Sequence, residues 1–324
     1  MVNLRNFNPG TISDQAAGVY PLFPDPTQSA ALPGPDDLVA WAKVHKAYEK
    51  QVAPLSKRLV KPLGATVDEI TLGPIKALEV TPKNWQESDR RIVYVHGGAY
   101  TMMSASSTLG SAAMVADVTG QKVLSLDYTV APKARWEQAL DEVKQAFRAI
   151  HDLGFPMEKL GAFGDSAGGG MIAGAVLKMR DEVMGMPAAL VLLSPWADIT
   201  ETGESYHTLK DAEPVYLYET ALGPSALAYA PLEDQKHPYV SPVYGAFTDG
   251  YPPTLIQGGT REIFLSNFVR LYQAIDQAGG DAKLDLYEGM PHVFQGTMLA
   301  AGAPEAQIAL NKIGSFFQQH LGLG

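Results

Sequence analysis

Short apolar runs recur along the chain from residue 66 onward, and each has the length and the apolar or β-branched content of a buried strand. The predicted strands are residues 66–72, 75–80, 91–95, 122–127, 159–163, 188–194, 253–257 and 282–287. The first two are close enough for a hairpin, and the later ones mostly alternate with helical stretches at 136–153, 167–183 and 262–278. Such alternation is typical of parallel strands joined by crossover helices. The pattern therefore predicts an α/β fold with an eight-stranded, mostly parallel sheet and helices on both faces.

The first part of the chain is interrupted by proline, at Pro9, Pro21, Pro24, Pro26, Pro33 and Pro35. Because proline blocks a regular helix, we expect residues 1–35 to form an extended arm draped over the rest of the protein. Asp36 and Asp37 then cap a helix that we expect to end at about residue 51. Its apolar stripe consists of Leu38, Trp41, His45, Tyr48 and Val52, which predicts an amphipathic packing helix.

A long excursion follows the strand predicted at 188–194. About sixty residues, rich in aromatic residues and leucine, separate it from the next strand, and so long an excursion is more often a lid than a structureless loop. No repeat or shift in composition marks a second independent domain. We therefore expect an α/β core of residues 56–196 and 246–324, with a helical cap built from residues 1–55 and 197–245.

Composition and charge exclude several classes of partner and chemistry. The 324 residues carry a formal net charge of −10, and no run of Lys or Arg opposes it, which argues against nucleic acid or an anionic membrane as a partner. The absence of cysteine removes disulfides, thiolate nucleophiles and sulfur-ligated metals. The amino terminus lacks the apolar region of a signal peptide, and no apolar run has the length of a spanning helix. We therefore expect a cytoplasmic protein without membrane insertion.

Candidate chemistry centres on Ser166, in the segment Gly164-Asp165-Ser166-Ala167-Gly168 between a predicted strand and a predicted helix. This is the G-x-S-x-G pattern of a nucleophile elbow, a strained turn that lifts a serine hydroxyl clear of the sheet. Small neighbours are needed because the turn brings two backbones close together. The following helix directs its amides and its positive dipole end toward an oxyanion beside the serine. For this pattern alone, a glycine-rich turn with an idle serine is the alternative.

A serine nucleophile needs a base, and the base needs an acid that orients it, in the chain order serine, acid, histidine for this type of turn. His292 follows the last predicted strand, where such a fold presents its histidine. Glu262 is the only carboxylate in the loop after the strand at 253–257, and its other interpretation is a stabilising contact with a helix dipole. We predict His292 as the base and Glu262 as the acid. Asp198 is the reserve acid, and Asp165 is a poor one because adjacent residues on a tight turn point apart.

The strand at 91–95 runs directly into His96-Gly97-Gly98-Ala99-Tyr100. Glycines at such a place let backbone amides approach a substrate carbonyl, whereas the alternative is an ordinary glycine turn. We expect His96 to hold this loop by side-chain hydrogen bonds. The amides from which we predict an oxyanion hole are those of Gly97, Gly98, Ala99 and Ala167.

Together these motifs resemble those of the hormone-sensitive-lipase-like esterases of the α/β-hydrolase fold, the bacterial family IV carboxylesterases. The resemblance covers roughly residues 90 to 295 in register. The matching segments are His96-Gly97-Gly98-Ala99-Tyr100, Leu126-Asp127-Tyr128-Thr129-Val130-Ala131-Pro132, Gly164-Asp165-Ser166-Ala167-Gly168-Gly169, Ser194-Pro195-Trp196-Ala197-Asp198, Val240-Ser241-Pro242 and Gly289-Met290-Pro291-His292-Val293-Phe294. The resemblance implies an α/β-hydrolase that cleaves small, neutral, fairly apolar esters without a metal or an organic cofactor.

Three positions depart from the family pattern. Ala99 stands where a third glycine is usual, and we expect alanine to be accommodated there without a positive φ. Thr129 replaces a common arginine, which removes an expected ion pair. The acid-bearing segment, usually Asp-Pro-Leu, reads Glu262-Ile263-Phe264. Some similar enzymes also have a glutamate at this position, and part of them resemble monoterpene ε-lactone hydrolases. The resemblance therefore adds lactones to the expected substrates.

The expected function is hydrolysis of carboxylic esters with short to medium acyl chains, through a Ser-His-Glu triad and an acyl-enzyme. A lactone, amide or thioester hydrolase with the same triad is the first alternative, because triad and oxyanion hole serve any acyl group. A non-catalytic small-molecule receptor on this fold is the remote one. The expected partners are a small-molecule ester and a possible second copy of the chain, with no nucleic acid.

Overall fold

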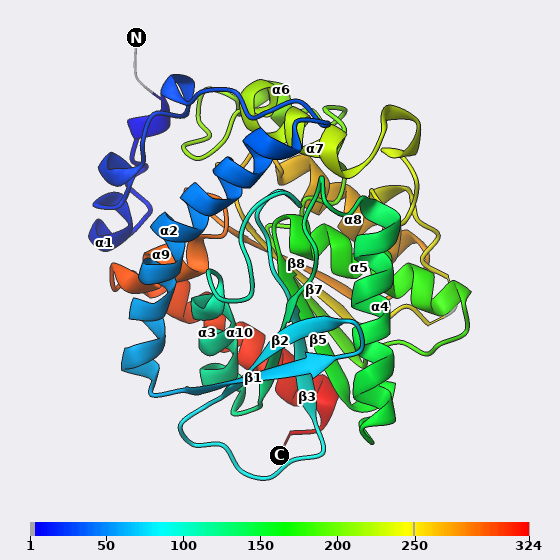
Figure 1. The fold of residues 1–324 in the computed structure, drawn as a ribbon. Coiled ribbons are helices and arrows are strands. Elements are labelled where there is room, and N and C mark those ends of the chain that lie inside the picture. Colours follow the sequence, from blue (N-terminus) through cyan, green and yellow to red (C-terminus); the bar gives the residue numbers. More distant parts are fainter. Residues whose placement is uncertain (1–3, 249, 324) are drawn as a thin grey trace.

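A single mixed sheet runs through the middle of the protein, with helices against both of its faces (Figure 1). The computed structural model describes residues 4–248 and 250–323. Within these residues the sheet has eight strands, in the order β1-β2-β4-β3-β5-β6-β7-β8. The strands are β1 (Thr66–Leu72), β2 (Ile75–Thr81), β3 (Arg91–Val95), β4 (Val123–Asp127), β5 (Leu160–Asp165), β6 (Ala189–Leu193), β7 (Thr254–Gly259) and β8 (Ala282–Tyr287). The predicted α/β architecture, with its eight-stranded and mostly parallel sheet, is confirmed.

Strand direction follows from the connections. A tight turn joins β1 to β2, which pair antiparallel, and β2 also pairs antiparallel with β4. The pairs from β4 onward are parallel, because helical crossovers connect their strands. The carboxyl ends of β3, β5, β6, β7 and β8 therefore meet along one edge. In open α/β sheets this edge is where ligands bind.

The two faces of the sheet carry different helices. One face is covered by α4 (Trp136–Asp152), α5 (Ala167–Asp181) and α8 (Leu265–Gln277), and the other by α3 (Leu109–Thr119) and α10 (Pro304–Leu321). Successive side chains of a strand point to opposite faces. In β3, for example, Val93 and Val95 pack into the first core, whereas Ile92 and Tyr94 pack into the second. Both faces are buried, which explains why the strand sequences are almost continuously apolar.

The proline-rich arm differs from its prediction, because it contains short helical turns and is not simply extended. These turns are η1 (Leu4–Asn6), α1 (Asp14–Ala17), η2 (Tyr20–Leu22) and η3 (Pro26–Gln28). Pro21 and Pro26 stand in the first turn of η2 and η3, where proline lacks no needed hydrogen bond. The arm is draped over the protein as expected: the Tyr20 hydroxyl donates a hydrogen bond to the carbonyl of Gly289.

The next helix, α2 (Leu38–Leu63), begins at the predicted capping residue but is longer than predicted. The Asp37 carboxylate accepts a hydrogen bond from a backbone amide of the first turn, at 2.9 Å. The helix continues beyond residue 51, with Pro54 and Pro62 inside it, and ends at Gly64, whose φ is 66°. The predicted end was wrong because tertiary packing outweighs the helix-breaking tendency of proline.

Packing against α3 holds the second half of α2. The Ser56 hydroxyl accepts a hydrogen bond of 2.7 Å from the amide of Gly110, at the start of α3. In the first half, Trp41 is buried and donates its indole N–H to the carbonyl of Gly34 at 2.9 Å. Leu38, by contrast, is 57% exposed, so it does not belong to the buried stripe in which the sequence placed it.

Segments before β1 and between β6 and β7 lie over the carboxyl edge of the sheet, where Figure 1 shows the start of α2 beside α6 and α7. The excursion after β6 contains α6 (Ser205–Thr208), η5 (Tyr218–Leu222), α7 (Gly223–Tyr229), η6 (Leu232–Asp234) and η7 (Pro242–Tyr244). The amide of Leu32 donates to the carbonyl of Thr220 at 2.8 Å, which links the arm to this excursion. Tyr229 stacks on Tyr100 at a centroid distance of 3.8 Å and thereby connects α7 to the loop after β3.

Among the described residues, no helix has both the length and the apolar character needed to cross a membrane. The position of the protein in the cytoplasm and a possible homodimer stay predictions.

Candidate active site

The predicted site residues meet at the carboxyl edge of the sheet, beside a cavity of about 650 Å³. Ser166 and His292 both line this cavity, together with Gly98 and Tyr216. Its remaining walls come from the arm, α2, α3 and α9 (Phe294–Ala300), and they are mainly apolar. Leu22, Leu55 and Ala300 are exposed, so the cavity opens between the arm, α2 and α9.

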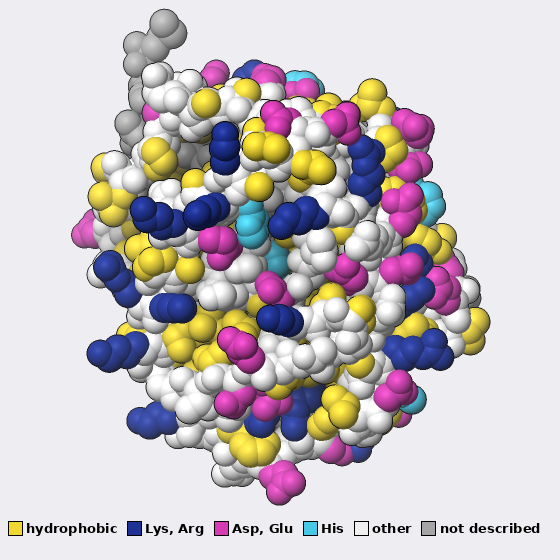
Figure 2. Space-filling model, in the orientation of Figure 1, with side chains coloured by type: hydrophobic (Ala, Val, Ile, Leu, Met, Phe, Trp, Pro, Cys, Tyr) yellow, Lys and Arg dark blue, Asp and Glu magenta, His cyan; other side chains and the backbone are white. Residues whose placement is uncertain are grey.

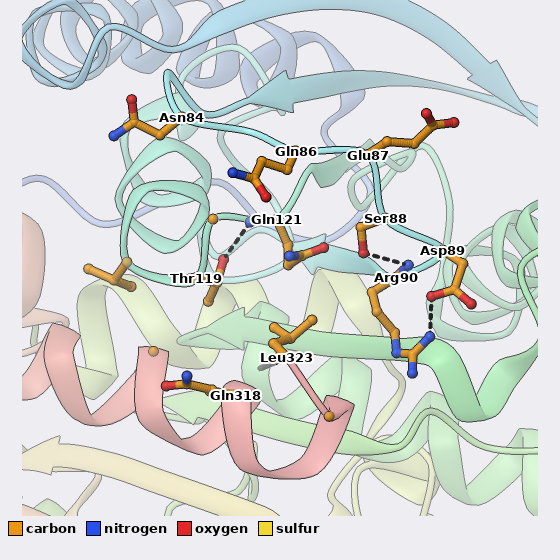
Figure 3. A pocket seen from close by; sticks show the side chains of 14 residues that line it. Asn84, Gln86, Glu87, Ser88, Asp89, Arg90, Thr119, Gln121, Gln318 and Leu323 are labelled. Carbon is orange, nitrogen blue, oxygen red and sulfur yellow. Dashed lines mark hydrogen bonds and ion pairs between the residues drawn. The ribbon is translucent and has the colours of Figure 1, made fainter.

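A second hollow lies at the opposite edge, before β3 and β4, and has a different character. Polar side chains line it, and Figure 3 shows several of them bonded to their neighbours. The Ser88 hydroxyl accepts from the amide of Arg90 at 3.1 Å, and the Thr119 hydroxyl accepts from the amide of Gln121 at 3.3 Å. Its lining residues include no histidine, so this hollow offers no pair of serine and base.

Ser166 lies on the sharp turn between β5 and α5, with a φ of 53° that non-glycine residues rarely adopt. The residues two positions before and after it are glycines for a steric reason: a Cβ on Gly164 would lie 2.4 Å from the Gly168 carbonyl oxygen, and a Cβ on Gly168 would lie 2.1 Å from the Val95 carbonyl oxygen. The amide of Ser166 donates to the Leu193 carbonyl at 2.8 Å, which fixes the turn to the end of β6. The G-x-S-x-G segment is therefore an elbow in geometry as well as in sequence.

His292 and Glu262 are hydrogen-bonded to each other. The distance from His292 Nδ1 to Glu262 Oε2 is 2.7 Å, and both side chains are buried. The other carboxylate oxygen, Oε1, accepts from the Gly259 amide at 2.6 Å and from the Ser194 hydroxyl at 2.8 Å. Ser194 Oγ accepts in turn from the Val293 amide at 3.0 Å. Glu262 is thus held by three donors, one of which also binds the residue after His292.

The contact between Glu262 and His292 favours a protonated imidazole, whereas burial alone would disfavour it. Burial lowers the pKa of His292, but the hydrogen bond and the negative charge of Glu262 outweigh it, so the pKa lies above its ordinary value. Among the described residues, His292 Nε2 has no hydrogen-bond partner. Because Nδ1 is bonded to Glu262, Nε2 is the nitrogen available to a neighbour in the cavity. Tyr216 and Phe264 meet the imidazole edge to face, at centroid distances of 5.2 and 5.1 Å, and fix its plane.

The two other candidate acids are engaged elsewhere. Asp198 forms an ion pair of 2.5 Å with Arg270 and accepts from the Tyr244 hydroxyl at 2.9 Å. Asp165 accepts from the Tyr94 hydroxyl at 2.5 Å and from the Gly97 amide at 3.1 Å. Neither carboxylate is bonded to His292, which leaves Glu262 as the acid in contact with it.

The loop after β3 lies against the elbow, but its amides are not equivalent. The amide of Gly97 is already bonded to Asp165. Those of Gly98 and Ala99 donate no hydrogen bond within the described residues, and the amide of Ala167, in the first turn of α5, has no intrahelical partner. Three of the four amides predicted for an oxyanion hole are therefore free to donate.

Two details of this loop bear on the sequence interpretation. Ala99 has a φ of 52°, so the expectation that alanine would avoid a positive φ was wrong, and packing of the loop against the elbow imposes the strained conformation. His96 bonds through Nδ1 to the Gly97 carbonyl oxygen at 2.8 Å and stacks on Tyr128 at 4.3 Å. Thr129, in place of the family arginine, donates its amide to the buried Glu142 at 2.7 Å.

Two residues that contact the loop of Glu262 were not among the predicted site residues. Ser194 directly follows β6 and begins one of the segments that match the esterase family, but no role was predicted for it. Glu213 lies in the excursion after β6, where its fully buried carboxylate accepts from the amides of Val215 and Ile263 at 2.8 and 3.1 Å. Burial raises the pKa of Glu213 to about 7, although the nearby His292 opposes the shift. No pattern along the chain indicated that Glu213 would lie next to the residue after Glu262.

Comparison with known proteins agrees with this geometry. The sequence pattern of the α/β-hydrolase fold family matches residues 92–296, which include the loop after β3, the elbow, Glu262 and His292. The chain belongs to this family. An acetyl-hydrolase of Streptomyces hygroscopicus is 32% identical over 257 residues, or 79% of this chain and 84% of that protein. An esterase of Acinetobacter venetianus is 30% identical over 248 residues, or 76% of this chain and 80% of that protein.

Solved structures show which members of the family this chain resembles. The crystal structure of an esterase matches with a TM-score of 0.90 and 28% identity, over 99% of this chain and 97% of that one. A hormone-sensitive lipase from a metagenome library matches with a TM-score of 0.78 and 30% identity, over 84% of this chain and 91% of that one. The predicted resemblance to hormone-sensitive-lipase-like esterases is confirmed, and this α/β-hydrolase is a carboxylic ester hydrolase.

The contact between Glu262 and His292 can be tested on the protein without a substrate. In a Glu262→Gln variant the pKa of His292 should fall, because the substitution removes the negative charge and keeps the burial that favours neutral imidazole. NMR titration of the ring C–H signals measures this pKa, and the loss of one signal in His292→Asn assigns it. Asp198→Asn is the matched control, since it neutralises a buried carboxylate that is bonded to Arg270. An equal fall in both variants would contradict the assignment.

Proposed function

We propose that this α/β-hydrolase cleaves small, neutral carboxylic esters through a Ser166–His292–Glu262 triad and an acyl-enzyme. The observation that supports the proposal most directly is the 2.7 Å hydrogen bond between buried Glu262 and His292, since His292 lines the same cavity as Ser166. It leaves Nε2 as the proton acceptor and holds the ring in the tautomer that a serine nucleophile requires.

In the proposed first half-reaction, Ser166 Oγ attacks the ester carbonyl carbon while its proton moves to His292 Nε2. The carbonyl oxygen becomes an oxyanion, stabilised by the amides of Gly98, Ala99 and Ala167; one such donor typically contributes about 10²–10³-fold in rate. We leave Gly97 out of this set because its amide is bonded to Asp165. The carbon–oxygen bond to the alcohol then breaks, and the alcohol departs with the proton from Nε2.

In the second half-reaction, water attacks the acyl-serine carbonyl and gives its proton to His292 Nε2. The tetrahedral intermediate collapses, Ser166 recovers its proton and the carboxylic acid leaves. The raised pKa of His292 means that the base is neutral, and hence active, only at a pH above that pKa. Because His292 Nε2 has no hydrogen-bond partner among the described residues, its hydrogen bond to Ser166 is expected to form when an ester binds.

The cavity supports esters with a short to medium apolar acyl chain. Its walls from α2, α3 and α9 are mainly apolar, and Gly296 of α9 faces side chains of α2 and α3: a Cβ there would lie 3.4 Å from Met114 and 3.9 Å from Leu59. We also propose that residues 1–55 and 197–245 act as a cap over a core of residues 56–196 and 246–324, since both cap segments lie over the carboxyl edge. A lactone hydrolase would use the same groups.

Ser166→Ala is expected to abolish hydrolysis of p-nitrophenyl acetate, butyrate, octanoate and palmitate, because no other group in the cavity replaces the nucleophile. Release of p-nitrophenol from purified protein measures the rate, and a mass shift after treatment of wild type with a phosphonate ester locates the nucleophile independently. Undiminished turnover in Ser166→Ala would reject the central proposal. An ε-lactone assayed in parallel, compared by kcat/KM, decides between ester and lactone as the better substrate.

Glu262→Gln should lower kcat for p-nitrophenyl butyrate by up to about 10⁴-fold, the order found when the acid of a serine triad becomes an amide and the wrong imidazole tautomer is favoured. Asp198→Asn should leave kcat near the wild-type value, since Asp198 is bonded to Arg270 and Tyr244. Steady-state kinetics of both variants test this, with thermal unfolding as a check on folding. The reverse pattern would assign the acid role to Asp198.

Gly296→Leu should lower the octanoate-to-acetate ratio of kcat/KM by about ten-fold or more, because each methylene accommodated in an apolar pocket contributes that order of discrimination. The leucine would fill the space between Met114 and Leu59, while acetate needs no such space. Gly296→Ala is the matched control, because its Cβ makes only ordinary contacts. An unchanged ratio in Gly296→Leu would show that the acyl chain does not enter this part of the cavity.

A further inference from the structure

The outer face of α2 carries a stripe of basic side chains, which we call the α2 basic stripe. Its members are Lys43, Lys46, Lys50, Lys57, Arg58 and Lys61, and all six are exposed. At about 100° per residue, they fall within an arc of about 120° around the helix axis. Residues on the opposite arc, such as Trp41, Ser56 and Val60, are buried. The stripe is therefore one continuous surface of the folded protein, although its members are spaced along the sequence.

The positive charges of the stripe are not neutralised by ion pairs. Among the described residues, none of the six side chains forms an ion pair with a carboxylate. The one acidic residue of α2, Glu49, turns inward and accepts hydrogen bonds from Ser104 and Ser107 at 2.9 and 2.8 Å. The whole chain has a formal net charge of −10, so this concentration of unpaired cations is opposite in sign to the rest of the protein.

Apolar side chains are exposed beside the stripe. Val39 and Leu55 of α2 are 69% and 54% exposed, and Leu22 of the arm is 79% exposed. Figure 2 shows Lys and Arg side chains spread over the face on which α2 lies, with hydrophobic side chains between them. Leu22 and Leu55 also line the cavity of Ser166. The mouth of the cavity is thus bordered by apolar side chains and lies next to the basic stripe.

We propose that the α2 basic stripe docks this esterase onto a lipid surface that carries anionic headgroups. Each Lys or Arg held near such a surface contributes about 1 kcal/mol, and exposed apolar side chains enter the boundary between headgroups and acyl chains. The exposed leucines favour lipid over nucleic acid as the partner, because a phosphodiester backbone offers them no apolar phase. Docking in this orientation turns the mouth of the cavity toward the lipid, from which apolar esters partition into it.

Sedimentation with vesicles tests the docking directly. Wild-type protein should bind vesicles of phosphatidylcholine mixed with phosphatidylglycerol, fail to bind phosphatidylcholine alone, and dissociate at about 1 M salt, where the Debye length is only about 3 Å. A Lys46→Gln/Lys50→Gln/Lys57→Gln variant should bind the anionic vesicles about a hundred-fold more weakly, since about 3 kcal/mol is lost and 1.4 kcal/mol is a factor of ten.

A matched control removes the same charge elsewhere. Lys133→Gln/Lys236→Gln/Lys283→Gln replaces three exposed lysines outside α2 and should bind like wild type. Both triple variants should hydrolyse p-nitrophenyl butyrate without lipid at the wild-type rate, which shows that they fold. Ser166→Ala should still bind, so failure of docking and failure of the catalytic proposal are separate results. Absent or equal binding to both vesicle types, equal losses in the two triple variants, or tighter binding to duplex DNA would overturn the proposal.

Discussion

The site depends on one steric constraint, the contact between the backbone of the elbow and the end of β3. A Cβ on Gly168 would collide with the Val95 carbonyl oxygen, and a Cβ on Gly97 would lie 2.5 Å from the Asp165 carboxylate. Because glycine leaves both positions without a side chain, the loop after β3 can lie directly on the turn that carries Ser166. Asp165 then bonds to the Gly97 amide and fixes the loop. The serine and the free amides beside it are thus placed by a single packing arrangement, and the strained φ values at the elbow and at Ala99 are its cost.

A second arrangement, of buried polar groups, holds the acid. Glu262 lies between two residues that are bound to the segments over the carboxyl edge. Arg261 donates to carbonyl groups of the arm, including that of Phe7 at 2.6 Å, and its guanidinium lies over the ring of Tyr20. Ile263 donates its amide to Glu213. A buried carboxylate without donors would be costly, and here every oxygen of Glu262 is satisfied. The orientation of His292 therefore depends on the arm and on the excursion after β6 as well as on the sheet.

Helix α2 contributes both to the cavity of Ser166 and to the surface of the protein. Its inner side contributes Val52 and Leu59 to the cavity, whereas its outer side carries cations without ion pairs, one of which, Arg58, also lines the cavity. One amphipathic helix thus forms a wall of the substrate site and a charged outer surface. The net negative charge of the chain argued against an anionic membrane as a partner, but a total charge says nothing about how charges are distributed over one helix.

The sequence by itself determined the sheet and the residues that are proposed for the site. Apolar runs alternating with helices predicted eight strands, since strands that are buried on both faces of a sheet consist almost entirely of apolar residues. Ser166, Glu262 and His292 were predicted as site residues because each follows a strand of the sheet, namely β5, β7 and β8. Only the tertiary structure decided that α2 continues beyond Pro54 and that Gly97 bonds to Asp165. It also decided that the backbone of Ala99 is strained. The positions of Glu213 and Ser194 beside the loop of Glu262 were decided in the same way. These features arise from contacts between residues far apart in the chain, whereas periodicity and turn chemistry report only on near neighbours.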